Sequence, residues 1–463
     1  MAKHKTNVAG TSRDQMDSSL DIGKLAVSVQ GKLSILRPFS NNCSIFRVPK
    51  RLRELNEKAY TPQVISIGPL HHGKQGLKKM EEHKRLYLRE FLELSEVNVK
   101  DFIAAIAEKE DKLRNCYAET FDNLSQEEFV EMVLLDCSFL IMFLLKRSFR
   151  GLRSPNTDRI FNKPWMNEDI IRFDLCLLEN QLPFFIVEDL FKRSKIQDRH
   201  EEYSMIEVTR DLLSCEWGSW APKSSILKEI NLSKGKHFVD FLRICQKPGE
   251  HMQPKKLETP TAPSVAELHR AGIKFKLGSS KNLLDIKFDE NEGTLEIPQL
   301  QIGKRTEILF RNLQAFELCN CGRKKYVRDY IAMLSFLVTS SKDVEILVKY
   351  EILRNSLDDN DAVSILFRNL SKENVINANH FYFSGVVEDL NKYYGKRGHN
   401  WEAFLEQNSS RNPWTIISVV AAAVLVILTI IQTLLDHSSS FIMITQLFCL
   451  ALSLKFYNMV TRA

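Results

Sequence analysis

The chain has 463 residues, of which 44% are hydrophobic and 26% charged, a balance typical of folded globular proteins and not of disordered chains. Its 64 basic and 58 acidic residues leave a net charge of +6, too weak and too dispersed for a nucleic-acid-binding surface, so we expect no nucleic-acid partner. The nine cysteines are odd in number and scattered, and several fall in apolar helical patterns, which favours reduced, buried thiols.

Residues 1–44 contain few large apolar residues and no sustained period, and we predict a mobile leader there. No apolar stretch of a cleavable secretory signal occurs between Met1 and Gln30. A helical core region is expected over 45–245. It opens with a short basic amphipathic helix beginning at Pro49, whose cations either face solvent or face an anionic lipid or an acidic partner.

A strand-like run then leads into a glycine-rich loop that is close to a phosphate-binding loop but lacks two of its parts. Gln75 stands where a Ser or Thr hydroxyl would reach Mg²⁺, and Pro69 removes one backbone donor. We therefore expect no nucleotide site. His71 and His72 are adjacent, so their side chains point apart in an extended segment, and a structural turn is favoured over a metal site.

Apolar residues at helical spacing predict helices over 77–94 and 102–121. Ser125 and Glu128 have the spacing of a capping box, which satisfies the free amides at a helix start. The helix that follows, 129–145, is apolar almost all round and is interrupted by acidic residues. It is predicted to be a buried central helix and not a membrane span. Two further amphipathic helices are expected over 203–217 and 237–245.

Three acidic residues inside apolar patterns, Asp136, Asp174 and Glu179, are expected to be buried. Buried carboxylates can act as acids or bases, but they more often hold a helix end or an arginine, and the structural role is favoured here. The run from Leu177 to Phe185 predicts one helix ending near Asn180 and another starting at Pro183. Two buried helices are therefore expected to meet at a polar elbow.

Residues 246–263 are rich in proline and poor in apolar residues, which predicts a linker. The following region, 264–411, is expected to hold a small β-sheet plus helices that pack on the core. Alternating apolar residues predict three short strands of an antiparallel sheet, and helical patterns resume at Thr306. Cys319 and Cys321 have no second pair of suitable spacing, so no metal is expected. The strands are expected at 273–277, 284–288 and 295–297.

The run from Trp414 to Leu435 carries no charged residue and follows Asn412 and Pro413, which are suited to begin a helix. Crossing a bilayer takes about 20 apolar residues, so this run predicts a transmembrane helix over 412–435 that contacts membrane lipid. The tail, 436–463, holds a shorter apolar run at 441–454, either an interfacial helix or half of a hairpin. The expected fold class is mainly α: a multi-helix headpiece with a small antiparallel β-sheet and a C-terminal transmembrane helix.

The expected location is the plasma membrane or an endomembrane, crossed once near the C-terminus. Lys396, Arg397 and Arg411 precede the run, against Lys455 after it, and this bias places the headpiece in the cytosol. A lumenal headpiece is the alternative, because the chain also carries sites suited to N-glycosylation. These Asn-x-Ser sites are Asn42, Asn123, Asn231, Asn369 and Asn408.

Seven ordered blocks of residues occur together between Ile45 and Leu435. They are Val48-Pro49, Ser66-Ile67-Gly68-Pro69 with His71-His72-Gly73, Asp174 through Phe185, Gly272 through Phe275, Leu295 through Pro298, Asn312 with Ala315-Phe316-Glu317, and Asn412-Pro413-Trp414. With these blocks the chain resembles the plant family known as domain of unknown function 247. Leu70, where the family usually has Tyr, and Met142, where a Glu is common, are small departures. The resemblance implies a plant protein with a mostly helical headpiece and a C-terminal membrane anchor, and it supplies no catalytic residues. Some relatives resemble recognition proteins of grass self-incompatibility, which suggests binding.

The motifs of common hydrolases, metalloproteases, redox proteins and nucleotide-binding proteins are absent from the sequence. We therefore expect a membrane-anchored protein that binds a protein partner without catalysis. No catalytic, cofactor-binding or metal-binding residue and no cofactor is predicted. The alternative is a membrane-bound enzyme that uses buried groups such as Asp136, Asp174, Glu179 or His71, and a purely structural scaffold is a third, weaker possibility.

Overall fold

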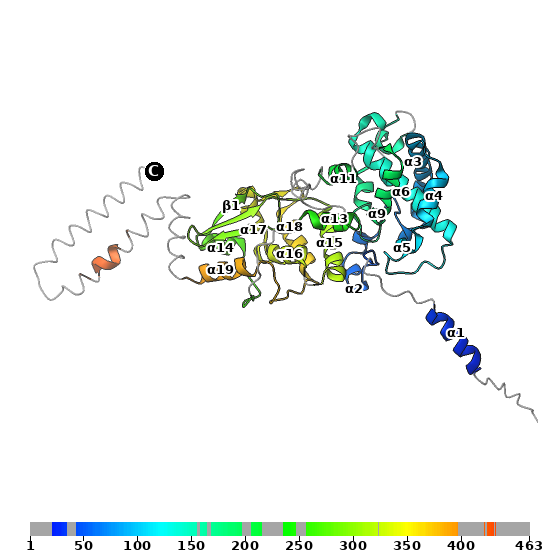
Figure 1. The fold of residues 1–463 in the computed structure, drawn as a ribbon. Coiled ribbons are helices and arrows are strands. Elements are labelled where there is room, and N and C mark those ends of the chain that lie inside the picture. The colour runs from blue at the N-terminus through cyan, green and yellow to red at the C-terminus, as the bar shows by residue number, and fades with distance from the viewer. Residues whose placement is uncertain are drawn as a thin grey trace, which may run out of the picture.

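The structure is a computed structural model of the whole chain. It describes residues 21–34, 43–154, 158–163, 168–196, 205–214, 235–246, 256–322 and 324–396, and near the C-terminus residues 421, 424–429 and 431. The body of the described chain has two lobes, and one end of the elongated C-terminal lobe meets the N-terminal lobe (Figure 1). The N-terminal lobe holds the helices α3 to α11, and the C-terminal lobe holds α13 to α19 with the sheets.

The N-terminal lobe is organised around α6 (Gln126–Ser148), which α3, α4, α9 and α11 contact. Ser125 and Glu128 form the predicted capping box at its start. Because α6 is apolar on almost every side, helices can cover it all round, and the predicted buried central helix is confirmed. The other helices of the lobe are α3 (Lys79–Ser95), α4 (Val99–Ala107), α5 (Glu110–Arg114), α7 (Arg159–Asn162), α8 (Glu168–Asp174), α9 (Phe184–Arg193) and α11 (Met205–Ser214).

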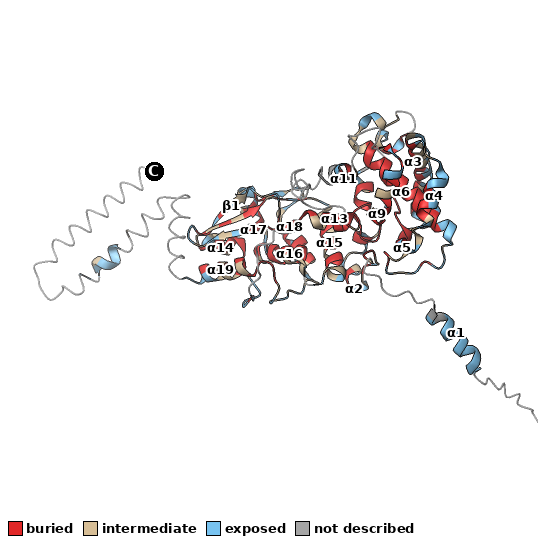
Figure 2. Cartoon of the chain, in the orientation of Figure 1, coloured by how far each residue is buried: buried red, intermediate tan, exposed pale blue. Residues whose placement is uncertain are grey.

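The C-terminal lobe packs helices around α15 and α16, and its buried residues continue the core of the N-terminal lobe (Figure 2). The short helices α2 (Lys50–Arg53) and η1 (Glu57–Tyr60) lie where the lobes meet, and η1 contacts α15. The helices of this lobe are α13 (Phe238–Cys245), α14 (Val265–Arg270), α15 (Thr306–Asn320), α16 (Tyr326–Leu337), α17 (Ser341–Lys349), α18 (Asn360–Ser371) and α19 (Ser384–Gly395).

The expected antiparallel sheet is a mixed sheet instead. Its strands β1 (Lys274–Gly278), β2 (Lys287–Asp289) and β3 (Thr294–Pro298) follow the order β1-β3-β2. β3 pairs antiparallel with β2 but parallel with β1. The alternation of apolar residues identified the strands, but it does not tell which strands are neighbours. A second, parallel pair, β4 (Leu300–Ile302) with β5 (Leu353–Asn355), was not predicted because each strand is too short to show a period.

Two segments differ from their sequence interpretation. The leader contains the helix α1 (Ile22–Ser34), whose described side chains are exposed and which Figure 1 draws away from both lobes. In the expected linker, Leu257 is buried and donates its N–H to Ala378 of the C-terminal lobe. Among the described cysteines, all of which are free thiols, four are buried as expected, whereas Cys319 is exposed.

The predicted transmembrane helix needs correction. In the described part of the chain, no helix has the length and apolar character needed to cross a membrane. Within 412–435 only residues 421, 424–429 and 431 are described. The remainder of 412–435 and the apolar run 441–454 lie outside the described residues. The fold class is therefore mainly α with small sheets.

One buried side chain of α15 ties the two lobes together. Asn312 is fully buried, and its Oδ1 accepts the N–H of Leu178 from the N-terminal lobe at 2.8 Å. Its Nδ2 donates to the carbonyl oxygens of Ala59 in η1 and Ile308 in α15, both at 2.7 Å. Neither Leu178 nor Ala59 lies in a sheet or a long helix, so this amide replaces the partners that regular structure would supply.

Replacing Asn312 with alanine is expected to lower the free energy of unfolding by about 2 to 4 kcal/mol, because the Leu178 N–H and the Ala59 carbonyl stay buried without partners. Denaturant titration monitored by circular dichroism measures the change. Asn320→Ala is the matched control, since Asn320 ends the same helix and its Nδ2 has no hydrogen-bond partner in the described chain. A loss equal to that of the control contradicts the assigned role of Asn312.

Candidate functional site

The predicted polar elbow exists as residues 174–182, which connect α8 to α9. Its Asn180 and Gln181 are buried and carry amide side chains that bond backbone groups on several sides. Asn180 accepts the N–H of Ile67 at 2.7 Å and donates to the Ile65 carbonyl at 3.0 Å. Gln181 accepts the N–H of Phe238, at the start of α13, at 2.9 Å. The elbow therefore holds an N-terminal segment and the C-terminal lobe at once.

Glu179 in the elbow is fully buried and lies at the centre of a charged cluster. It accepts the Val48 N–H at 2.8 Å and hydrogen bonds from Arg53, and His71 Nε2 lies 3.2 Å from its other oxygen. Burial alone would raise the pKa of Glu179, but these donors outweigh it and the pKa is lowered. Burial also lowers the pKa of His71, which favours the neutral ring beside the carboxylate.

Asp174 and Asp136 hold the same N-terminal segment at further points. Asp174 accepts the backbone N–H groups of Gln63, Val64 and Ile65 at 2.7 to 2.9 Å, while burial raises its pKa to about 6. Asp136 on α6 accepts the N–H of Gly68 at 2.8 Å. Burial raises the pKa of Asp136, and the ion pair with Lys84 opposes that rise.

The candidates Asp136, Asp174, Glu179 and His71 do not converge on one cavity. Asp174 borders a small cavity of about 70 Å³, and its oxygens already accept three backbone bonds. Gly68 has a φ of +73°, and an added Cβ would clash with the Gln181 carbonyl oxygen. Its N–H is bound to Asp136. The glycine-rich loop therefore follows the elbow closely and does not offer this amide to a phosphate.

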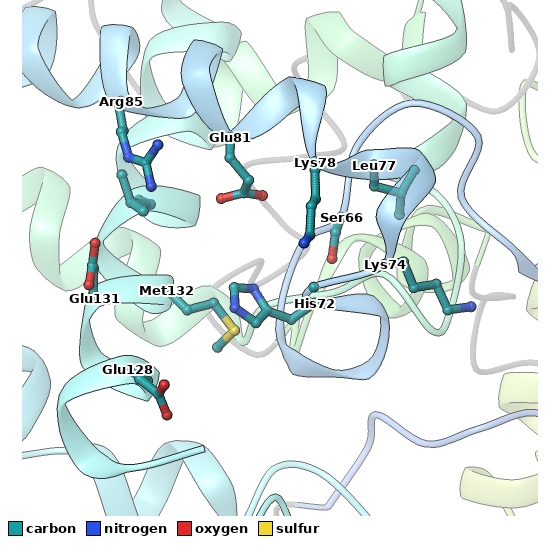
Figure 3. Close-up of a pocket in the computed structure, with 12 residues that line it drawn as sticks. Ser66, His72, Lys74, Leu77, Lys78, Glu81, Arg85, Glu128, Glu131 and Met132 are labelled. Carbon is teal, nitrogen blue, oxygen red and sulfur yellow. The ribbon is translucent and has the colours of Figure 1, made fainter. Parts of the chain in front are cut away.

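A separate hollow of about 400 Å³ lies between the loop 66–74, the start of α3 and the first turns of α6 (Figure 3). His71 and His72 point apart as predicted: His71 points to Glu179, and His72 lines the hollow. The residues that line this hollow are Ser66, His72, Gly73, Lys74, Leu77, Lys78, Glu81, Arg85, Glu128, Glu131, Met132 and Leu135.

The rims of the hollow carry opposite charges (Figure 3). Lys78 and Arg85, at the start and on the first turns of α3, are exposed, as are Glu128 and Glu131 on α6. In the part of the chain that the structure describes, no ion pair joins Arg85 to Glu131. Leu77, Met132 and Leu135 are buried and form an apolar floor. The hollow thus combines an apolar floor with charges of both signs that are open to a ligand.

Glu81 links the hollow to the buried charges behind it. The ammonium of Lys84 donates to Glu81 at 2.7 Å and forms an ion pair with Asp136 at 2.6 Å, and Lys84 itself is fully buried. Burial alone would lower the pKa of Lys84, but the carboxylates of Asp136 and Glu81 outweigh it and raise the pKa. Within the described residues, no group of three or more potential ligands is arranged to hold a metal ion.

Sequence reasoning missed the hollow as a whole. Ser66, Lys78, Arg85 and Glu131 belong to a loop and to two helices that are remote in sequence. Ser66 stands in one of the seven blocks of the family resemblance, whereas Lys78, Arg85 and Glu131 stand in none of the motifs. The one available signal was the exposed face of the predicted helix 77–94, which carries cations at helical spacing and was interpreted only as part of an amphipathic helix.

Comparison with known proteins gives one family and no solved structure. The sequence model of domain of unknown function 247, a plant protein of unknown function, matches residues 45–428. The "UPF0481 protein At3g47200" of Arabidopsis thaliana is 30% identical over 423 residues, or 85% of this chain and 86% of the relative. The "Putative UPF0481 protein At3g02645" of the same plant is 24% identical over 490 residues, or 86% of this chain and 91% of the relative. No solved structure matches the chain.

Replacing Glu179 with glutamine is expected to lower the free energy of unfolding by about 2 to 4 kcal/mol near pH 7, because Arg53 and Arg47 lose the carboxylate that faces them. The folded-state pKa of Glu179 is lowered, so its contribution is present above the unfolded pKa of about 4.3 and is lost as the pH falls through the folded value.

Denaturant titrations between pH 3 and pH 7 measure the difference between the wild type and Glu179→Gln. The difference should shrink towards pH 3. Glu54→Gln is the control, since Glu54 is exposed and pairs only with exposed Lys50 at 3.7 Å. A Glu179→Gln variant that is as stable as the control at pH 7 contradicts the structural role of the cluster.

Proposed function

The chain belongs to the plant family known as domain of unknown function 247, and on this premise we propose that it is a recognition protein that binds a segment of a partner protein in the hollow, without catalysis. The observation that carries the proposal is the pair of oppositely charged rims over an apolar floor. A volume of about 400 Å³ falls within the usual range of ligand pockets.

The two rims favour a polypeptide that carries both signs of charge. Lys78 and Arg85 attract acidic groups, while Glu128 and Glu131 attract basic groups. A partner in the reversed direction would place like charges against each rim, which costs affinity, so the rims select both a sequence and an orientation. The floor of Leu77, Met132 and Leu135 supplies apolar contact area for the same segment.

The arrangement of polar groups supports binding over catalysis. Within the described residues the Ser66 hydroxyl at the hollow has no hydrogen-bond partner, so no base is hydrogen-bonded to it as activation of a nucleophile requires. Asp136, Asp174 and Glu179 accept backbone N–H groups or pair with cations. The alternative of an enzyme that uses these buried acids therefore receives no support from their positions.

The proposal predicts that filling the mouth of the hollow abolishes partner capture. Glu131→Trp places an indole at the α6 rim and should lower the recovery of the partner by about tenfold or more. Glu127→Trp is the matched control, because Glu127 is exposed in the first turn of the same helix but does not line the hollow. The measurement is quantitative mass spectrometry of proteins that co-purify with the tagged full chain from plant tissue.

The wild type and Glu127→Trp should both recover one protein in stoichiometric amount. Equal recovery with Glu131→Trp contradicts the location of the site. Repeated recovery of the chain alone, with wild type under mild conditions, contradicts the proposed function itself.

A further inference from the structure

Ser66 places a hydroxyl at the hollow that the fold leaves unsatisfied. The residue is 2% exposed, and its Oγ has no hydrogen-bond partner among the described residues. A buried polar group without a partner costs about 1–3 kcal/mol, and one that lines a cavity, as Ser66 does, can regain a partner from a bound molecule. The backbone N–H groups of Ile67 and Gly68 already donate to Asn180 of the elbow and to Asp136, so neither serves as a donor to the Ser66 hydroxyl.

Two further donors face the same part of the hollow. The Lys78 side chain extends towards Ser66 and the His72 ring in Figure 3. His72 Nδ1 is buried and has no hydrogen-bond partner in the described chain, and Lys78 forms no ion pair there. A hydroxyl, an imidazole and an ammonium group can together donate three hydrogen bonds to one polar group of a ligand.

The charges around these donors favour an anion over a cation. The Lys78 ammonium lies at this end of the hollow, whereas Glu128 and Glu131 stand on the α6 side, and the Lys74 side chain extends away from the hollow. Glu81 also lines the hollow, but the buried Lys84 ammonium pairs with it at 2.7 Å. The apolar floor lowers the local dielectric constant, which strengthens hydrogen bonds between a charged acceptor and its donors.

We propose that Ser66, His72 and Lys78 form a subsite for an oxyanion, the carboxylate or phosphate group of the ligand that the hollow binds. This inference rests on the proposed function, since it assigns the chemical class of one end of the bound segment. The opposite end, near Glu128 and Glu131, then takes a basic group. The subsite binds the anion by hydrogen bonds and charge alone, and no covalent step is involved.

The test titrates the full chain with inorganic phosphate and, separately, with acetate at constant ionic strength, and follows the melting temperature. A ligand that binds only the folded state raises this temperature in a saturable way. Lys78→Gln should weaken the binding by about tenfold, as expected for the loss of one charge-assisted hydrogen bond. Lys79→Gln is the matched control, because Lys79 begins α3, is exposed and does not line the hollow.

Ser66→Ala gives a second readout that a structural serine would not give. Because its hydroxyl has no partner in the fold, the variant should melt at or above the wild-type temperature without added anion and still bind the anion more weakly, by about fivefold. A saturable shift with phosphate alone identifies a phosphate group as the natural ligand group, and one with acetate alone identifies a carboxylate. Either result supports the subsite.

The inference is overturned if neither anion gives a saturable shift, or if Lys78→Gln and Lys79→Gln bind equally well. Its failure is separable from failure of the proposed function. Partner capture that depends on Glu131 without anion binding rejects the subsite alone. If anion binding depends on Lys78 but partner capture is unchanged by Glu131→Trp, the proposed binding of a partner in the hollow is rejected and the anion subsite is retained.

Discussion

The fold depends on buried side chains that satisfy a backbone segment lacking regular structure. Residues 63–68 belong to no helix or sheet, and from Ile65 to Gly68 they are buried, where backbone N–H and carbonyl groups need partners. Asp174, Asn180 and Asp136 accept the N–H groups of Gln63, Val64, Ile65, Ile67 and Gly68 in turn. These acceptors come from α6 and from the elbow. They therefore connect residues 63–68 with the central helix α6 and with the region where the two lobes meet.

This arrangement also shapes the hollow, because the side of residues 63–68 that faces away from the elbow forms part of its wall. His71 turns inward to Glu179, and its neighbour His72 turns outward to the hollow. Lys84 is bonded to Asp136, which holds Gly68, and to Glu81, which lines the hollow. Charges that stabilise the fold are thus adjacent to charges that remain open to a ligand.

The sequence predicted the parts whose signal is local. The capping box at Ser125 and the buried helix α6 follow from short patterns of caps and apolar spacing, and the elbow follows from the run around Glu179. The strand order was missed because pairing of β1 with β3 depends on contacts between distant residues. The transmembrane helix was predicted from an uncharged apolar run that follows Asn412 and Pro413, and none of the described helices has the length and apolar character to cross a membrane.

The candidate site shows the same difference between features with a local sequence signal and features that depend on contacts between distant residues. Burial of Asp136, Asp174 and Glu179 was predicted from their apolar neighbours, and their structural role agrees with the interpretation that was favoured. The hollow depends on the approach of Ser66, Lys78 and Glu131 from three elements, which no spacing in the sequence encodes. The cytosolic location of the headpiece stays a prediction.

The central claim is that buried side chains hold residues 63–68 as firmly as a sheet would. Amide hydrogen exchange resolved to single residues in the full chain tests it most directly. We expect the amides of Ile65, Ile67 and Gly68 to exchange as slowly as those in the middle of α6, although each donates to a side chain and, within the described residues, none donates to a backbone carbonyl. Exchange at the rate of an exposed loop would contradict the claim, and with it the basis for the shape of the hollow.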